Sequence, residues 1–354
     1  YIIQNNGSMN ITSTGNLTVG MDANYNITQY AGSMNLTGTS NGNHGVRLVN
    51  ITQYGGNLNV SGTSANSLGV VILLGSSVQN GTGSINITGT STSGIGFLAH
   101  GGSLSQVNGS LNITGSGNTS IGVALTGTVI NQTGGTLNIT GNSNYSSGVA
   151  LGQSTSLGNS TAYNTTTSLW TNVTKVVNAT NTSTYDTYTS YSNGSSTLTT
   201  TAIPAFNLTV ANGNNLTITG TSKTGTGIAV EGQSNLTISA GTLVLNGTIS
   251  GAQGSGVRFA GSQTNTTSVV TTGANTTNST INHSIDTALN LMGTGNLTFT
   301  GSSASGAGVY LAGGNVTLNN AGTGSLNLNG TSTSGQGVQL GGVTQTTKIN
   351  VSAT

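Results

Sequence analysis

A short segment, of which Ser-Leu-Asn-Ile-Thr-Gly is typical, recurs ten times along this chain. Its first apolar residue stands at Met9, Met34, Leu58, Ile85, Leu111, Leu137, Leu216, Leu243, Leu297 and Leu326. Seven of the nine steps between copies measure 24 to 29 residues, and the other two measure 79 and 54 residues. A repeat of this length is typical of a solenoid, in which each unit is one coil stacked on the next.

Each unit contains three short segments with the pattern of strands. In Leu-Asn-Ile-Thr the apolar residues are two positions apart, which is the period of a strand with one buried face. A second segment, headed by Gly as in GVAL at 122–125, recurs in nine units, and a third, weaker one such as VINQT at 129–133 in seven. Gly at the corners supplies the positive φ of tight turns. Residues 1–354 are therefore predicted to form one all-β domain.

The predicted architecture is a right-handed parallel β-solenoid (β-helix) of about ten triangular coils, stacked about 4.8 Å apart. Coils of uneven length favour this form over the left-handed type that hexapeptide repeats build. The repeat also argues against disorder, which the richness in Gly, Ser, Thr and Asn would otherwise suggest.

Two insertions account for the long steps. Residues 152–205 and 262–285 both lie between the second and third strands of a coil. Because successive coils stack in register, we expect both to leave the same edge of the solenoid as loops, where repeat proteins place variable function. The longer one holds a candidate contact loop of aromatic residues, Tyr163, Trp170, Tyr185, Tyr188 and Tyr191. These rings either contact a sugar or partner protein or hold the loop against the solenoid wall.

Charge is nearly absent from the chain. Only five Lys/Arg and four Asp/Glu occur in 354 residues, whereas about one residue in four is charged in typical domains. The basic residues are scattered singly, which excludes a nucleic-acid binder. No Cys is present, so no disulfide forms. No apolar run reaches the roughly eighteen residues of a membrane-spanning helix. The chain opens at Tyr1 without Met, and we interpret it as a processed or excised segment.

Asn-x-Ser/Thr sequons occur at 33 of the 46 Asn residues, well above the number expected from composition. Strand alternation alone could create them, by placing Asn and Thr on the outer face. However, where the usual Asn is lost, a sequon reappears at Asn215 and Asn296, and the insertions carry ten more. We therefore predict N-glycosylation. The candidate sites are Asn10, Asn35, Asn59, Asn86, Asn112, Asn138, Asn159, Asn164, Asn172, Asn178, Asn181, Asn193, Asn215, Asn265, Asn275 and Asn296.

The spacing of the first six of these sites opposes full occupancy, because the Asn residues would stack only about 4.8 Å apart. Partial occupancy, or a hydrogen-bonded Asn ladder of the kind found in stacked strands, resolves the difficulty.

Catalytic and metal-binding groups are sparse and dispersed. The four acids are Asp22, Asp186, Glu231 and Asp286, and the three histidines are His44, His100 and His283. No two are predicted to converge, so we expect no catalytic site, no metal and no cofactor. Glu231 and Arg258 are expected to form an exposed pair worth under about 1 kcal/mol. A polysaccharide-active enzyme is a remote alternative.

Ice binding is a second remote alternative. It requires regular outward Thr-x-Thr arrays, and in the first strand we recognise this motif only in the coils that contain Thr217 and Thr298.

The units GSLNITGSGNTSIGVAL (109–125) and GSLNLNGTSTSGQGVQL (324–340) resemble repeats of large secreted bacterial β-helix adhesins, the filamentous-haemagglutinin and autotransporter class. The resemblance covers nearly the whole chain outside the insertions. It implies export, a right-handed β-helix, and a role in attachment or matrix, and some members of the class carry Asn-linked sugars.

Both ends of the sequence match the third strand of a coil, with no polar or helical cap. The candidate assembly residues are Tyr1, Ile2, Ile3, Lys348, Ile349 and Val351. Uncapped solenoids expose edge strands that invite pairing. The chain is therefore expected to be a slice of a longer adhesin or a subunit that stacks head to tail.

The sequence favours a non-enzymatic, extracellular structural protein: a glycosylated solenoid subunit of a cell-surface or matrix filament. The alternative is a repeat segment of a secreted adhesin that binds host or neighbouring cells. The expected partners are further copies of the chain, covalent N-glycans and a cell-surface or carbohydrate receptor, and not nucleic acid.

Overall fold

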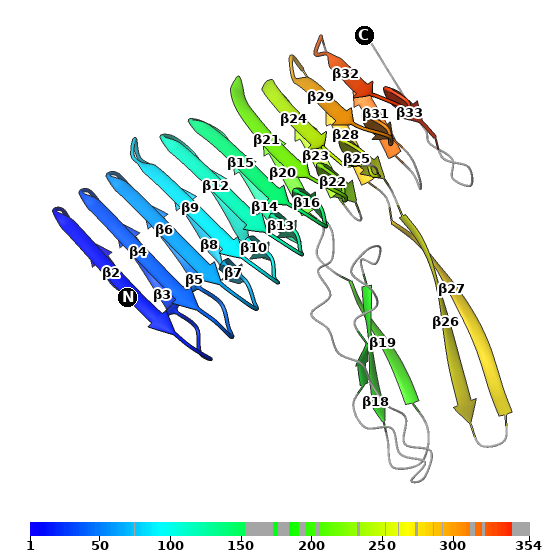
Figure 1. Cartoon of the computed structure of the whole chain (residues 1–354), viewed down its shortest axis with the longest axis horizontal. Helices are drawn as coiled ribbons and strands as arrows, with labels where there is room; N and C mark the ends of the chain where they lie inside the picture. The colour runs from blue at the N-terminus through cyan, green and yellow to red at the C-terminus, as the bar shows by residue number, and fades with distance from the viewer. Residues whose placement is uncertain are drawn as a thin grey trace.

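A computed structural model describes residues 1–73, 75–152, 173–175, 184–190, 196–202, 206–231, 234–251, 253–260, 262–272, 275–285, 287–291, 293–311, 316–320 and 323–341. Within these ranges the regular structure is entirely β. The strands form a long parallel β-solenoid (Figure 1), which confirms the predicted fold class. The hand of the coil stays a prediction.

The ten sequence repeats form one parallel sheet of ten strands. In spatial order these are β2 (Ser8–Gly15), β4 (Ser33–Ser40), β6 (Asn57–Ser64), β9 (Ser84–Ser91), β12 (Ser110–Gly117), β15 (Thr136–Ser143), β21 (Asn214–Ser222), β24 (Gly241–Ile249), β29 (Asn296–Ser303) and β32 (Leu326–Ser332). Equivalent residues of successive repeats are paired, so Leu111 lies between Ile85 and Leu137. About nine turns of the chain connect these ten strands.

The second and third strands of each coil belong to an eighteen-stranded sheet. The second strands are the first part of β3 (Met21–Gln29) and of β5 (Val46–Gln53), then β7 (Val70–Leu73), β10 (Phe97–His100), β13 (Val123–Thr126), β16 (Val149–Leu151), β22 (Ile228–Glu231), β25 (Val257–Ala260), β30 (Val309–Leu311) and β33 (Val338–Leu340). The third strands are β1 (Ile2–Gln4), the ends of β3 and β5, β8 (Ser76–Gln79), β11 (Ser103–Gln106), β14 (Val129–Gln132), β20 (Phe206–Val210), β23 (Ser234–Ile238), β28 (Thr287–Leu291) and β31 (Val316–Asn320).

The core is a continuous apolar column inside the coils. In β9, Ile85 and Ile87 are each 1% exposed, whereas their neighbour Asn86 faces outward. In nine of the ten coils the corner between the first and second strands has no room for a side chain. A Cβ on Gly115 would lie 2.1 Å from the carbonyl oxygen of Gly122, and Gly occupies this position in nine of the ten first strands. Gly at the corner is therefore a packing requirement.

A serine hydroxyl closes the same corner in seven coils, and the serine is buried in six of them. In β15 the Ser143 hydroxyl donates to the carbonyl oxygen of Ser120 at 2.7 Å and accepts from the backbone N–H of Ser146 at 2.9 Å. Ser40, Ser64, Ser91, Ser222, Ser303 and Ser332 make the same pair of contacts. Each hydroxyl thus ties one coil to the preceding one.

A column of buried glutamines ends the third strand in the first coils. Gln29 donates to Gln4 at 3.0 Å, Gln53 to Gln29 at 2.8 Å, and Gln79 to Gln53 at 3.1 Å. Gln106 and Gln132 continue the column, and all of these side chains are at most 3% exposed. The sequence pattern did not predict this column, nor the third strands β8 and β11 that contain Gln79 and Gln106, because a polar residue stands at an inward position.

Both insertions contain antiparallel strands. β26 (Ser262–Thr272) and β27 (Asn275–Ile285) form a hairpin, and β17 (Val173–Lys175), β18 (Thr184–Ser190) and β19 (Ser196–Ala202) form a small sheet. The sequence analysis predicted insertions here but not these strands. As predicted, both follow a second strand, and Figure 1 shows them on the same side of the solenoid.

Candidate interaction surfaces

A ladder of asparagine side chains runs across the outer face of the ten-stranded sheet. It joins Asn10, Asn35, Asn59, Asn86, Asn112 and Asn138. In each step the amide nitrogen of the later residue donates to the amide oxygen of the earlier one, over 2.6 to 2.9 Å. The ladder stops where Thr217 replaces Asn opposite Asn138. The structure thus contains the hydrogen-bonded ladder, and the glycan occupancy of these sites stays a prediction.

Other candidate glycosylation sites differ in their surroundings. Asn215 is exposed, whereas the amide oxygen of Asn296 accepts from the backbone N–H and the hydroxyl of Ser325, at 3.0 and 2.7 Å. The backbones of Asn265 and Asn275 lie in β26 and β27, and their side chains are outside the described part. Asn159, Asn164, Asn172, Asn178, Asn181 and Asn193 lie outside the described residues altogether.

Exposed turns carry further sequons. Asn80 and Asn108 lie in the corner between the third and first strands, in the sequences Asn-Gly-Thr and Asn-Gly-Ser, and both are exposed. The Asn108 amide oxygen accepts from the backbone N–H of Gly109 at 2.9 Å, and its amide nitrogen makes no hydrogen bond with the described residues. Such turns offer a glycan more room than the ladder does.

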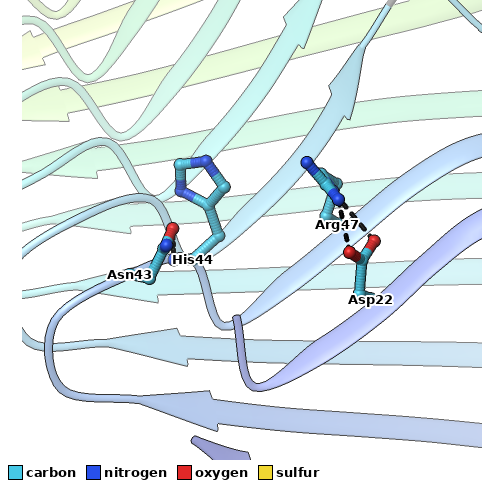
Figure 2. A network of polar contacts seen from close by, with 4 residues as sticks. All are labelled: Asp22, Asn43, His44 and Arg47. Carbon is cyan, nitrogen blue, oxygen red and sulfur yellow. Dashed lines mark hydrogen bonds and ion pairs between the residues drawn. The ribbon is translucent and has the colours of Figure 1, made fainter. Parts of the chain in front are cut away.

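An ion pair links the first two coils on the outer surface (Figure 2). Asp22 and Arg47 are directly opposite in β3 and β5, and the Arg47 Nε donates to Asp22 Oδ1 at 2.8 Å. A second guanidinium nitrogen contacts the other carboxylate oxygen. The hydrogen bond with Asp22 raises the pKa of Arg47 above its ordinary value.

His44 lies beside this pair, at the turn before β5 (Figure 2). Its backbone N–H donates to the Asn43 side chain at 2.8 Å, and its Nδ1 lies 2.9 Å from the Ser67 hydroxyl. Burial, reinforced by the positive charge of Arg47, lowers the pKa of His44, and Asp22 partly opposes this effect.

The second ion pair differs from the expectation. Arg258 and Glu231 do pair, with Nε and Oε1 3.1 Å apart. However, Glu231 is only 5% exposed, so the prediction of an exposed pair is wrong for the carboxylate. Glu231 is the last residue of β22. The sequence pattern could not reveal this burial, because Glu at a strand end usually faces solvent.

Ionisable groups do not gather elsewhere in the described ranges. No group of three or more His, Cys, Asp or Glu side chains there has the arrangement of a metal site. His100, at the end of β10, has its pKa lowered by burial. The side chain of Asp186 and the whole of Asp286 lie outside the described part, as does the side chain of His283. No described helix is long and apolar enough to cross a membrane.

Two further surface features involve uncharged groups. Tyr30 and Tyr54 stack in successive coils, with ring centroids 5.1 Å apart and planes inclined by 7°. About half of each side chain is exposed. A polar groove of about 480 Å³ lies along the corner after the first strand, lined by hydroxyl and amide groups together with Lys223. Sequence reasoning identified neither, although a Tyr pair 24 residues apart is a detectable signal in a repeat of this length.

The side chains of the candidate aromatic contact loop lie outside the described part of the chain. Tyr185 and Tyr188 lie in β18, without described side chains, whereas Tyr163, Trp170 and Tyr191 lie outside the described residues.

The terminal coils expose residues that are buried in the other coils. Val338 and Leu340 are 38% and 56% exposed, whereas Val309 and Leu311, their partners in the preceding coil, are 0% exposed. Of the candidate assembly residues, Tyr1 and Ile3 are exposed and Ile2 packs against the core. Lys348, Ile349 and Val351 lie outside the described residues.

Comparisons with protein-family models, curated proteins and solved structures found no match to this chain.

Proposed function

We propose that this chain is a non-enzymatic structural protein of the extracellular surface, and that its solenoid stacks end to end on further copies to form a filament. The observation that carries the proposal is the open apolar column at the last described coil. Val338 and Leu340 lie at the open end of a column whose inner side chains, such as their partners Val309 and Leu311, are fully buried. Burying an apolar side chain of this size contributes about 1.5–3 kcal/mol.

The first coil offers a complementary surface. Met9 and Ile11 in β2 are only half-buried, whereas the equivalent Met34 and Leu36 are 0% exposed. Docking β2 of one copy on β32 of another would continue both the apolar column and the main-chain hydrogen bonds of the ten-stranded sheet. Such a contact is heterologous and does not close, so it produces a fibre.

The asparagine ladder has the polarity that this contact requires. Each Asn donates to the Asn of the preceding coil, and Asn10 has no preceding coil within the described chain. Asn327 of β32 occupies the equivalent position at the other end. In the stacked pair, Asn10 of one copy would donate to Asn327 of the other, which favours correct register.

Sedimentation velocity at rising protein concentration tests the assembly. The double variant Val338→Lys/Leu340→Lys places two charges in the contact and should remain a single subunit. Gln339→Lys adds a charge to the same strand at an outward position and should assemble like the wild type. Equal assembly of the two variants would contradict stacking through this end.

The proposed extracellular location rests on the surface chemistry. An outer face of Asn, Ser and Thr with nine charges in the whole chain suits a sugar-coated protein, and we place the glycans first at exposed turns such as Asn80 and Asn108. Every ladder asparagine after Asn10 already uses its amide nitrogen in a hydrogen bond. Mass spectrometry of native protein should therefore give a mass above the bare polypeptide mass of 34.9 kDa. Peptide mapping should find higher glycan occupancy at the turns and insertions than at the ladder asparagines. A native mass of 34.9 kDa would contradict glycosylation.

A secreted adhesin is the second candidate, favoured by the two insertions on one side of the solenoid. In that case deletion of residues 152–205 should abolish attachment to cells and leave assembly intact. A filament subunit should keep both its assembly and its matrix role after the same deletion.

A further inference from the structure

The first strands extend further than the sequence pattern indicated. The expectation placed their end near the Gly of Leu-Asn-Ile-Thr-Gly, but β9 continues through Thr90 to Ser91. Thr88 and Thr90 therefore both face outward, separated by the inward Gly89. The earlier conclusion that Thr-x-Thr occurs in only two coils is thus wrong, because the motif lies two residues further along the strand.

Every coil presents an equivalent pair. The pairs are Thr12 with Thr14, Thr37 with Thr39, Ser61 with Thr63, Thr88 with Thr90, Thr114 with Ser116, Thr140 with Asn142, Thr219 with Thr221, Asn246 with Thr248, Thr300 with Ser302, and Asn329 with Thr331. We call these twenty residues the hydroxyl face. Fourteen are Thr, three are Ser and three are Asn. In register they form two columns across the ten first strands, the first from Thr12 to Asn329 and the second from Thr14 to Thr331. Figure 1 shows the row of first strands.

The first column of the hydroxyl face is free to bind an external partner, whereas in the second column Thr221 donates to the Asn142 side chain and Thr331 donates to the carbonyl oxygen of Gly301. None of the seven Thr hydroxyls of its first column, which includes Thr88 and Thr114, hydrogen-bonds within the described part of the chain. The neighbouring asparagine ladder, in contrast, satisfies its own amides. The outward positions of the ten strands carry no charged and no aromatic side chain.

The spacing of these groups is regular in two directions. Neighbouring strands are about 4.8 Å apart, and residues two positions apart along a strand are about 6.6 Å apart. Ten strands extend this lattice over about 43 Å. Thr is β-branched and therefore stiff at χ1, so its hydroxyl and methyl groups keep fixed positions.

We propose that the hydroxyl face binds crystalline water, that is, the surface of ice. The oxygen atoms of hexagonal ice repeat at comparable spacings along two crystal axes, so one lattice can match the other over many coils. An uncharged face suits this partner because ions hold their own hydration shells. A flat polysaccharide is less favoured, because the face lacks the aromatic rings on which sugars stack. Four residues of the second column, Thr90, Ser116, Asn142 and Thr221, line the polar groove, so the first column provides the cleaner test.

Ice-affinity partitioning of the glycan-free protein tests the proposal. A slowly growing ice surface should accumulate the wild-type protein relative to a co-dissolved inert protein, and the solution should show thermal hysteresis. The double variant Thr88→Tyr/Thr114→Tyr places two bulky rings in the middle of the first column, and it should lose both effects. Tyr is well tolerated in strands, and circular dichroism checks that the variant is folded.

Thr209→Tyr/Thr237→Tyr is the matched control. These two threonines also face outward in neighbouring coils, in β20 and β23 of the other sheet. This variant should partition into ice as the wild type does. Exclusion of the wild type from ice would overturn the proposal, as would equal loss in both variants. Binding to cellulose or chitin suspensions without binding to ice would assign the face to a polysaccharide and also overturn it.

Discussion

The side-chain amide of Asn112 donates a hydrogen bond to the amide oxygen of Asn86 at 2.9 Å, although 26 residues separate the two in the chain. Asn112 in turn accepts from Asn138 at 2.9 Å. Equivalent residues of successive coils are thus neighbours in space although they are distant in the sequence. The ladder therefore forms only when the coils stack in correct register, and it links the repeat in the sequence to the order of the structure.

Asn112→Ala should lower the free energy of unfolding by about 1 kcal/mol, because both hydrogen bonds are lost from a half-buried site. Asn112→Asp should lower the free energy of unfolding further at neutral pH, since a carboxylate cannot donate to Asn86. This loss of stability relative to the wild type should become smaller below about pH 4, where the carboxyl becomes protonated. Urea unfolding of both variants at pH 7 and pH 3.5, relative to the wild type at each pH, measures this. Asn5→Ala, at an exposed residue outside the ladder, is the control and should change little.

Gly115→Ala should destabilise the solenoid by about 1–3 kcal/mol or more, as expected for overpacking. The new Cβ would lie 2.1 Å from the Gly122 carbonyl oxygen and 2.6 Å from a Val123 methyl group. Gly7→Ala is a useful comparison, because no atom lies within 4 Å of its Cβ position. It should cost only the strain of its φ of +80°, roughly 1–2 kcal/mol. Thermal unfolding distinguishes the two, and equal losses would show that the corner has room.

The two ion pairs should respond differently to loss of their arginine. Arg47→Gln should cost less than about 1 kcal/mol, because Asp22 and Arg47 are both partly exposed. Arg258→Gln should lower the free energy of unfolding by more. It removes the guanidinium from beside the carboxylate of Glu231, which is only 5% exposed. Chemical denaturation at neutral pH measures both, and a larger loss for Arg47→Gln would contradict the assigned burial.

Stability should fall as pH is lowered from 7 towards 5. Burial holds the pKa of His100 below its ordinary value of 6.5 in the folded protein, so the unfolded chain binds the proton more readily. The contribution of neutral His100 to the free energy of unfolding is therefore complete above pH 6.5. It decreases as the pH falls towards the lowered pKa of the folded protein. His44 acts in the same direction. His100→Gln should flatten this pH dependence, as measured by urea midpoints across the range. An unchanged slope in a His44→Gln/His100→Gln double variant would contradict this explanation.

The repeats predicted the fold class, the positions of all ten first strands and the edge at which the insertions leave, because apolar side chains at alternate positions determine which face is buried. They did not predict Gln79 and Gln106 at inward positions, since an amide is buried only when the next coil supplies its partner. The pairing of Arg47 with Asp22 was missed because the two residues are 25 positions apart in the sequence. They become neighbours only when the two coils stack in register. Thr90 was missed because the strand continues past a glycine that usually ends strands.

The proposal of end-to-end stacking is tested most directly by electron microscopy of the purified protein over a range of concentrations. The stacked arrangement predicts unbranched filaments one solenoid wide, with a diffraction spacing of about 4.8 Å along the fibre axis. They should disappear in the Val338→Lys/Leu340→Lys variant. Monodisperse short rods of the wild-type protein at every concentration would contradict the account.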